Sequence, residues 1–285
     1  MCTIRRRGLI SGLAGGIFFG TAAIFIRLLT INSLSIVCYR LILGGLILLL
    51  ITKIPKQLSY ISTSFYLGTI LFLHFYFFVD SVQNTYILNA TLIVNSTPMI
   101  TLLLLFIFRL EKINKKDLFL VLIGFSGILL MTWHNLSLGN YLIGDIEALI
   151  AAFFISLYGI LGRMKVAGEY NPYNLAGLIY IFAGIEATSL TVGLGALEFP
   201  VGTNEIIYIF LLALIPTAIG HTLYLRSLKD LKPYETQILA LLEPIVATII
   251  GIFIFREFPP LLSIIGSGLV CLSIIVISHK YFKLK

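Results

Sequence analysis

The chain of 285 residues is 59% hydrophobic and 12% charged, and its mean hydropathy of +1.02 excludes a water-soluble domain. Its net charge of +7 does not indicate a nucleic-acid partner, because the basic residues gather at the ends of apolar stretches. The three cysteines have no disulfide or metal-ligand spacing, so we expect no metal and no other cofactor. Apolar stretches of about 20 residues, enough for a helix to cross the bilayer, recur along the chain and predict an all-α polytopic membrane protein.

The chain begins with a basic head, Arg5-Arg6-Arg7, which is followed by an apolar segment from Gly8 to Leu28. The segment is longer than the apolar core of a signal peptide and lacks a small-residue cleavage site, so we expect it to be the first spanning helix. Glycines at every fourth position lie on one face of this helix, where they favour either close helix packing or room for a ligand. They are Gly8, Gly12, Gly16 and Gly20.

Nine further spans follow at short intervals, and the polar turns between them are too short for a soluble domain. We expect these spans near residues 35–52, 63–80, 86–107, 118–134, 145–163, 174–195, 205–226, 234–254 and 261–279.

Lysine and arginine predict the orientation of these ten spans. With the N-terminus inside, the N-terminal head, the loops after spans two, four, six and eight and the C-terminal tail hold 17 of the 20 basic residues. We therefore expect a multi-pass protein of the cell membrane whose N- and C-termini are both cytoplasmic.

The chain carries one segment twice. Pro98 and Pro244 are each followed 13 residues later by a glutamate, Glu111 and Glu257, and a Phe-Ile-Phe-Arg string precedes each glutamate. An arginine likewise follows Gly8 and Gly144 by 19 residues. These matches predict two five-helix repeats, 1–138 and 139–285, and the odd number of spans inverts the second repeat in the membrane. Inverted repeats are typical of alternating-access carriers.

These residues resemble the drug/metabolite transporter superfamily and, within it, the EamA-type carriers of two five-helix repeats. The matching motifs are Phe19-Gly20 through Arg27, Tyr39-Arg40-Leu41, Leu242-Glu243-Pro244, Arg109 to Glu111 and Arg256-Glu257. The resemblance implies transport of small organic metabolites through a cavity lined by the first, third, fourth, sixth, eighth and ninth spans.

Glu243 is the first candidate for the transport site, because an ionisable side chain within a span is costly and is a functional candidate by default. The adjacent Pro244 lacks an N–H group and frees backbone polar groups near the middle of the membrane. A carboxylate at this position suits an amine, a cation or a proton. The other interpretation is a kink at which Glu243 is hydrogen-bonded between helices.

Polar side chains accompany the proline in both repeats. Thr91, Asn95 and Pro98 share one face of the fourth span, and Gln237 and Pro244 occupy equivalent positions in the ninth. The pattern predicts a pocket related by two-fold symmetry, although ordinary hydrogen bonding between helices gives the same pattern. We interpret both prolines as structural hinges.

His74 and His221 are equivalent in the two repeats, and each lies near the middle of its span. A proton relay, hydrogen bonding to a substrate and a purely structural role are all open for this pair. Tyr224 faces the same side as His221, and Pro216, one turn earlier, is expected to bend the eighth span.

The remaining candidates are a buried pair and several side chains near the cavity. We expect Arg40 and Glu186, which lie in the equivalent second helices of the repeats, to form a buried ion pair. Glu147 is expected to point into the mouth of the cavity. The aromatic residues expected to stack against a substrate are Phe18, Phe19 and Tyr158.

The sequence contains no metalloprotease, serine-elbow, aspartate-rich metal or phosphate-loop motif, so we do not expect an enzyme. We expect a secondary active transporter that exports an amino acid or a similar small-molecule metabolite, coupled to a proton or a cation. The main alternative is a multidrug or quaternary-cation exporter. An intramembrane lipid-modifying enzyme is a distant alternative, and a channel suits inverted repeats less well.

Overall fold

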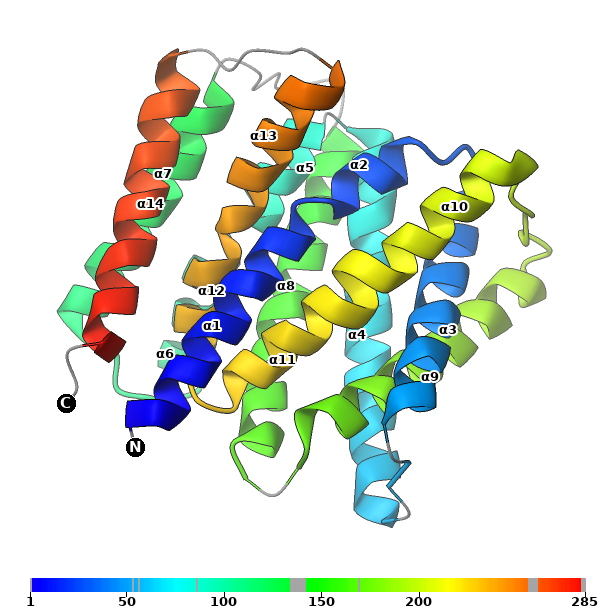
Figure 1. Cartoon of the computed structure of the whole chain (residues 1–285), viewed down its shortest axis with the longest axis horizontal. Helices are drawn as coiled ribbons and strands as arrows, with labels where there is room; N and C mark the ends of the chain where they lie inside the picture. The colour runs from blue at the N-terminus through cyan, green and yellow to red at the C-terminus, as the bar shows by residue number, and fades with distance from the viewer. Residues whose placement is uncertain are drawn as a thin grey trace.

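A computed structural model describes residues 2–52, 54–55, 57–85, 87–133, 142–168, 170–255 and 261–282. Every regular element in these ranges is a helix (Figure 1). The first half contains α1 (Cys2–Phe19), α2 (Ala22–Arg27), α3 (Ser33–Ile51), α4 (Leu58–Asn84), α5 (Ile87–Val94), α6 (Thr97–Ile107) and α7 (Lys115–Thr132). The second half contains α8 (Leu142–Val166), α9 (Pro172–Gly193), α10 (Gly202–Leu212), the π-helix η2 (Ala213–His221), α11 (Thr222–Leu228), α12 (Pro233–Ala240), α13 (Leu242–Phe255) and α14 (Leu261–Phe282).

These elements form the ten predicted spans, because consecutive helices such as α1 and α2 continue a single crossing of the bundle. Seven described stretches are long and apolar enough to cross a membrane. They are Arg6–Arg27, Ser33–Ile51, Leu58–Asn84, Ala90–Ile107, Leu142–Val166, Pro172–Gly193 and Gly202–Leu228. The all-α fold is therefore confirmed, whereas the boundary between the repeats at 138/139 and the motif Arg256-Glu257 lie outside the described residues.

The two halves run in opposite directions, as five spans per half require. In Figure 1, α1 rises from the end of the bundle where the N-terminus lies, and α8 descends toward that end. The last turns of α14 reach the same end.

The halves interlock through equivalent spans. α3 packs against α9 and α7 against α14, which are the second and fifth spans of each half. α4 packs against α8, and α1 packs against η2 and α11, so the first span of each half contacts the third span of the other. This exchange places the centre of the molecule between the halves.

The glycine face of α1 packs closely against the ninth span. A Cβ added to Gly16 would lie 2.5 Å from the carbonyl oxygen of Leu239, and one added to Gly20 would lie 2.6 Å from Val246. Because the backbone of Leu239 and the side chain of Val246 occupy this space, the glycines serve helix packing and leave no room there for a ligand.

Three spans are broken near the middle. The break between α5 and α6 falls at Asn95-Ser96, just before Pro98, and the break between α12 and α13 falls at Leu241, just before Pro244. These breaks agree with the disruption expected at the two prolines. A third break, at Gly20-Thr21 between α1 and α2, was not predicted. Pro216 lies within the π-helix η2, so the eighth span widens around this residue.

Candidate functional site

A cavity of about 60 Å³ lies between the two halves, beside the breaks of the fourth and ninth spans. Its lining comes from all six spans that we expected and also from the second span, through Arg40. The lining residues are Phe19, Ala22, Arg40, His74, Phe75, Phe78, Val94, Asn95, Thr97, Pro98, Ile155, His221, Tyr224, Gln237, Ala240, Leu241 and Glu243.

The carboxyl group of Glu243 reaches the cavity from the first turn of α13. Glu243 is buried, and Asn95 lies close enough to it for a side-chain hydrogen bond. Asn95 also donates from Nδ2 to the carbonyl of Thr91 over 2.8 Å. The equivalent of Glu243 in the first half is Thr97, whose hydroxyl donates to the carbonyl of Val94. Each half therefore brings a polar side chain to the cavity beside its break, and of these two side chains only Glu243 is ionisable.

The two equivalent histidines meet at the cavity. The ring centroids of His74 and His221 are 6.0 Å apart, and the ring of Phe75 lies 4.6 Å from that of His221. Nδ1 of His74 lies 3.0 Å from the carbonyl oxygen of Ala151. In contrast, Nδ1 of His221 is buried and has no protein partner.

Gln237 and two tyrosines continue this polar wall. The amide Nε2 of Gln237 donates to the hydroxyl of Tyr224 over 3.3 Å, while its Oε1 is buried without a partner. The ring of Tyr158 stacks on that of Tyr224 at 6.4 Å, and the buried hydroxyl of Tyr158 also lacks a partner. Buried polar atoms without partners are unusual in proteins, and three residues that carry one, Arg40, His221 and Gln237, line this cavity.

The predicted ion pair between Arg40 and Glu186 is wrong. Arg40 turns toward the cavity, where its Nε donates to the hydroxyl of Thr217 over 3.1 Å and its guanidinium carbon lies 3.9 Å from the centre of the Phe75 ring. Glu186 is only half-buried and accepts a hydrogen bond from the hydroxyl of Thr69 over 2.8 Å. The equivalent second helices do pack together, but these two side chains leave that interface on different sides.

Several predicted residues are absent from the cavity lining. Phe18 is half-buried and packs near Gly220, while the neighbouring Phe19 reaches the cavity and lies 4.5 Å from the ring of His221. Glu147 accepts a hydrogen bond from Nδ2 of Asn84 over 3.1 Å, between α4 and α8. The others that do not line the cavity are Thr91, Tyr158, Pro216 and Pro244.

Sequence reasoning missed Arg40 and Thr97 as cavity residues. Arg40 carried a usable signal, because any ionisable side chain within a span is a functional candidate. Thr97 carried one as well, because it occupies the position equivalent to Glu243 in the first half.

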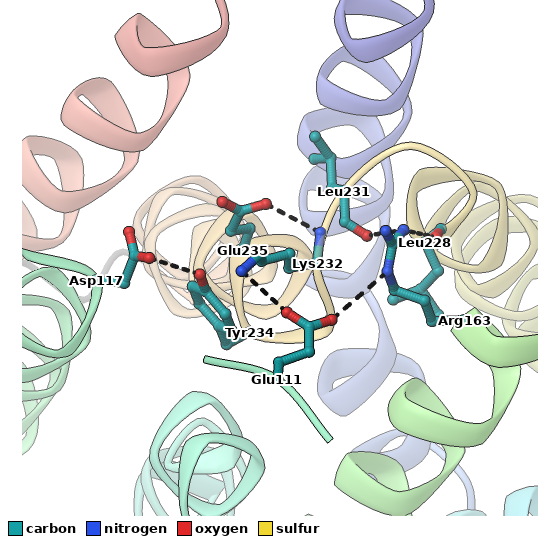
Figure 2. Close-up of polar contacts among 8 residues, drawn as sticks. All are labelled: Glu111, Asp117, Arg163, Leu228, Leu231, Lys232, Tyr234 and Glu235. Carbon is teal, nitrogen blue, oxygen red and sulfur yellow. Dashed lines mark hydrogen bonds and ion pairs between the residues drawn. The ribbon is translucent and has the colours of Figure 1, made fainter. Parts of the chain in front are cut away.

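A network of ion pairs and hydrogen bonds joins the two halves at the end of the bundle where α1 begins (Figure 2). Glu111, in the connection between α6 and α7, pairs with Lys232 over 3.0 Å and lies 3.9 Å from Nε of Arg163. Arg163 also donates to the carbonyl oxygens of Leu228 and Leu231 over 2.6 and 2.5 Å.

Nearby, the hydroxyl of Tyr234 donates to Asp117 over 2.7 Å, which adds a second link between the halves (Figure 2). The opposite end of the bundle is joined by Glu205, which accepts hydrogen bonds from the backbone N–H and the hydroxyl of Thr30 over 2.8 and 2.6 Å. Polar contacts between the halves therefore hold the bundle together on both sides of the cavity.

The duplicated helical bundle and its central polar cavity define a multi-pass membrane transporter. The model of the EamA-like transporter family matches the chain twice, at residues 6–133 and 142–279, and the chain belongs to this family of transporters within the drug/metabolite transporter superfamily, which are not enzymes.

Two curated relatives and one solved structure agree with this assignment. The chain is 22% identical over 281 residues to an uncharacterized transporter of Archaeoglobus fulgidus, and the match covers 95% of this chain and 96% of the relative. It is 24% identical over 207 residues to the protein RarD of Escherichia coli, covering 66% of this chain and 68% of RarD. A crystal structure at 15% identity has the same fold, with a TM-score of 0.80 over 98% of each chain.

Proposed function

We propose that this transporter is a secondary active carrier that exports an amino acid or a similar small metabolite across the cell membrane by alternating access. The observation that carries this proposal is the group of buried polar atoms without protein partners around the central cavity, on Arg40, His221 and Gln237. Such atoms are costly unless a ligand or water satisfies them during the working cycle.

The size of the cavity supports a closed state within an alternating-access cycle. A volume of about 60 Å³ holds no more than a few water molecules, so a metabolite requires the halves to separate. The links made by Glu111 on one side and by Glu205 on the other are between halves, and they have to break in turn for the cavity to open to either side.

Glu243 is the proposed site of the coupled proton or cation. It is a buried carboxyl group in the cavity, beside a helix break that exposes backbone polar groups. Its position allows substrate and ion to compete for, or to share, the same region of the cavity, which is the simplest form of coupling between two ligands.

The alternative substrate is a quaternary or multidrug cation. The aromatic rings of Phe19, Phe75 and Tyr224 line the cavity together with Glu243, which suits a cation with apolar groups. The guanidinium of Arg40 in the same cavity opposes a ligand that carries only positive charge, and we therefore favour the metabolite.

The test is transport by the purified protein in liposomes. Saturable exchange of a labelled amino acid against an unlabelled internal pool is the expected result. Saturable exchange of quaternary cations, with none of amino acids, would support the alternative substrate. Flux that never saturates would indicate a channel and would overturn the proposal.

A further inference from the structure

We propose that the guanidinium of Arg40 binds the carboxylate of the transported compound, so that the carrier selects zwitterions which place a carboxylate on Arg40 and an amine near Glu243. This inference rests on the proposed transport function and names the substrate class of the same cavity. It replaces the structural ion pair that the sequence predicted for Arg40.

The surroundings of Arg40 leave part of its guanidinium unused. The residue is fully buried, and Nε donates to the hydroxyl of Thr217. One terminal nitrogen is buried without any partner. Among the described residues, none of the ion pairs includes Arg40. A buried cation without a carboxylate partner is strongly unfavourable, which makes this nitrogen a candidate for an anionic ligand.

The geometry of the side chain also favours a carboxylate. The guanidinium lies over the ring of Phe75 at 3.9 Å, and this contact together with the bond to Thr217 fixes its plane. A planar guanidinium with a fixed orientation presents parallel N–H groups that match the two oxygens of a carboxylate. A lysine ammonium at the same position lacks this match.

The cavity holds a complementary group for the amine. Glu243 lines the same cavity as Arg40, and these two described side chains do not form an ion pair with each other. Gln237 lies on α12, the helix that precedes α13 in the ninth span, and its amide oxygen is buried without a partner. Acceptors therefore come from the ninth span and the donor comes from the second. A zwitterion is neutral overall and satisfies both sets, whereas a simple cation or anion satisfies only one.

The first experiment uses the unmodified protein and varies only the ligand. In liposomes, exchange of the labelled amino acid that the carrier transports best is measured in the presence of increasing concentrations of the unlabelled acid, its methyl ester or its N-acetyl derivative. We expect the ester and the N-acetyl derivative to inhibit about 10- to 100-fold more weakly than the free amino acid, which corresponds to the loss of one charged hydrogen-bonding pair. Equal inhibition by the acid and its ester overturns the inference.

The second experiment changes the proposed anchor. We expect Arg40→Lys to raise KM for the acid by about 10-fold or more with a smaller change in kcat. In Arg40→Gln, we expect the acid and its ester to inhibit exchange equally. The matched control is Glu186→Gln, because Glu186 lies on the equivalent second helix and outside the cavity. This variant should keep the wild-type preference for the acid over its ester. A merely structural Arg40 would lower the amount of folded protein without changing the ratio between acid and ester.

The outcomes separate this inference from the proposed function. If no solute exchanges saturably, the proposed function fails. If exchange is saturable but the best substrates lack a carboxylate, transport stands and the assignment of Arg40 is wrong. Should Arg40→Gln not fold, the comparison of acid and ester on the unmodified protein still decides the question.

Discussion

Glu243 and Thr97 show at the scale of single residues how a duplicated chain acquires an asymmetric site. Both follow a helix break, both line the cavity, and each precedes a proline by one residue. The difference between these two equivalent positions gives the cavity an ionisable side chain beside one helix break and a neutral one beside the other. The identity of the fold is unaffected, because the prolines and the packing around them are retained in both halves.

Replacing Glu243 with glutamine tests the coupling. Glutamine keeps the size and hydrogen-bonding capacity of the side chain but cannot exchange a proton, so we expect Glu243→Gln to lose stimulation of transport by an imposed pH gradient. Coupling free energies between two binding sites correspond to about 5- to 150-fold in affinity. Exchange without a gradient should remain measurable, with a raised KM. Gradient-driven and gradient-free transport are measured in the same liposomes.

Glu186→Gln is the matched control for this change, because Glu186 is half-buried and lies outside the cavity. If the pH gradient stimulates transport by Glu243→Gln as strongly as by the wild type, Glu243 is not the proton or cation site.

At the scale of helices, close approach of α1 to the ninth span depends on glycine. The closest backbone contact is that of Gly16 with Leu239 and Ala240. Backbone cannot move aside as a flexible side chain can, so any side chain at this position forces the two helices apart. The contact joins the halves, and its loss should disturb the cavity wall as well as the stability.

We expect Gly16→Ala to destabilise the protein by about 1–3 kcal/mol, the usual cost of overpacking a close contact. The matched control is Gly268→Ala in α14, where an added Cβ meets nothing within 4 Å. In that variant the better helix propensity of alanine should leave stability unchanged or slightly raised. Thermal unfolding in detergent, followed for both variants, measures the difference; equal midpoints would contradict the packing argument.

The network around Glu111 is the element-scale feature that we propose closes one side of the cavity. It ties the α6–α7 connection of the first half to α8 and to the α11–α12 connection of the second (Figure 2). We expect Glu111→Gln to weaken this closure and to raise, about two- to fivefold, the rate at which a cysteine at Ala240 in the cavity reacts with a maleimide added from that side. The modest factor reflects the low value of partly exposed ion pairs.

The control for that change is Arg226→Gln. Arg226 pairs with Asp230 over 2.7 Å at the same end, but both residues belong to the second half, so the closure between halves should be unaffected. Identical labelling rates in Glu111→Gln and in the unchanged protein would rule out this network as a gate.

At the scale of the whole molecule, the order of the ten spans assigns 17 of the 20 basic residues to one side of the membrane. We propose that this side is cytoplasmic, since lysine and arginine accumulate there in membrane proteins. A cysteine at the exposed Ala167, after α8, should then react with a membrane-impermeant reagent only in opened cells. A cysteine at Phe199, which is exposed between α9 and α10, should react in intact cells. The reverse pattern would invert the proposed topology.

The sequence by itself determined the class of the fold. Apolar stretches of spanning length dictate helices in a bilayer, because only a helix satisfies its own backbone there, and an odd number of spans per repeat dictates inversion. The repeated prolines located the helix breaks, and the rule that ionisable groups within spans are costly singled out Glu243, His74 and His221.

Only the tertiary structure decided which side chains share the cavity. Neighbouring residues on a helix point about 100° apart, so the rotation of each span selects Phe19 over Phe18, and a sequence pattern does not specify that rotation. The same limit produced the error at Arg40. The equivalent helices do pack together, but the partner of a long side chain depends on which neighbouring helix the side chain reaches. Arg40 reaches Thr217 and the cavity rather than Glu186.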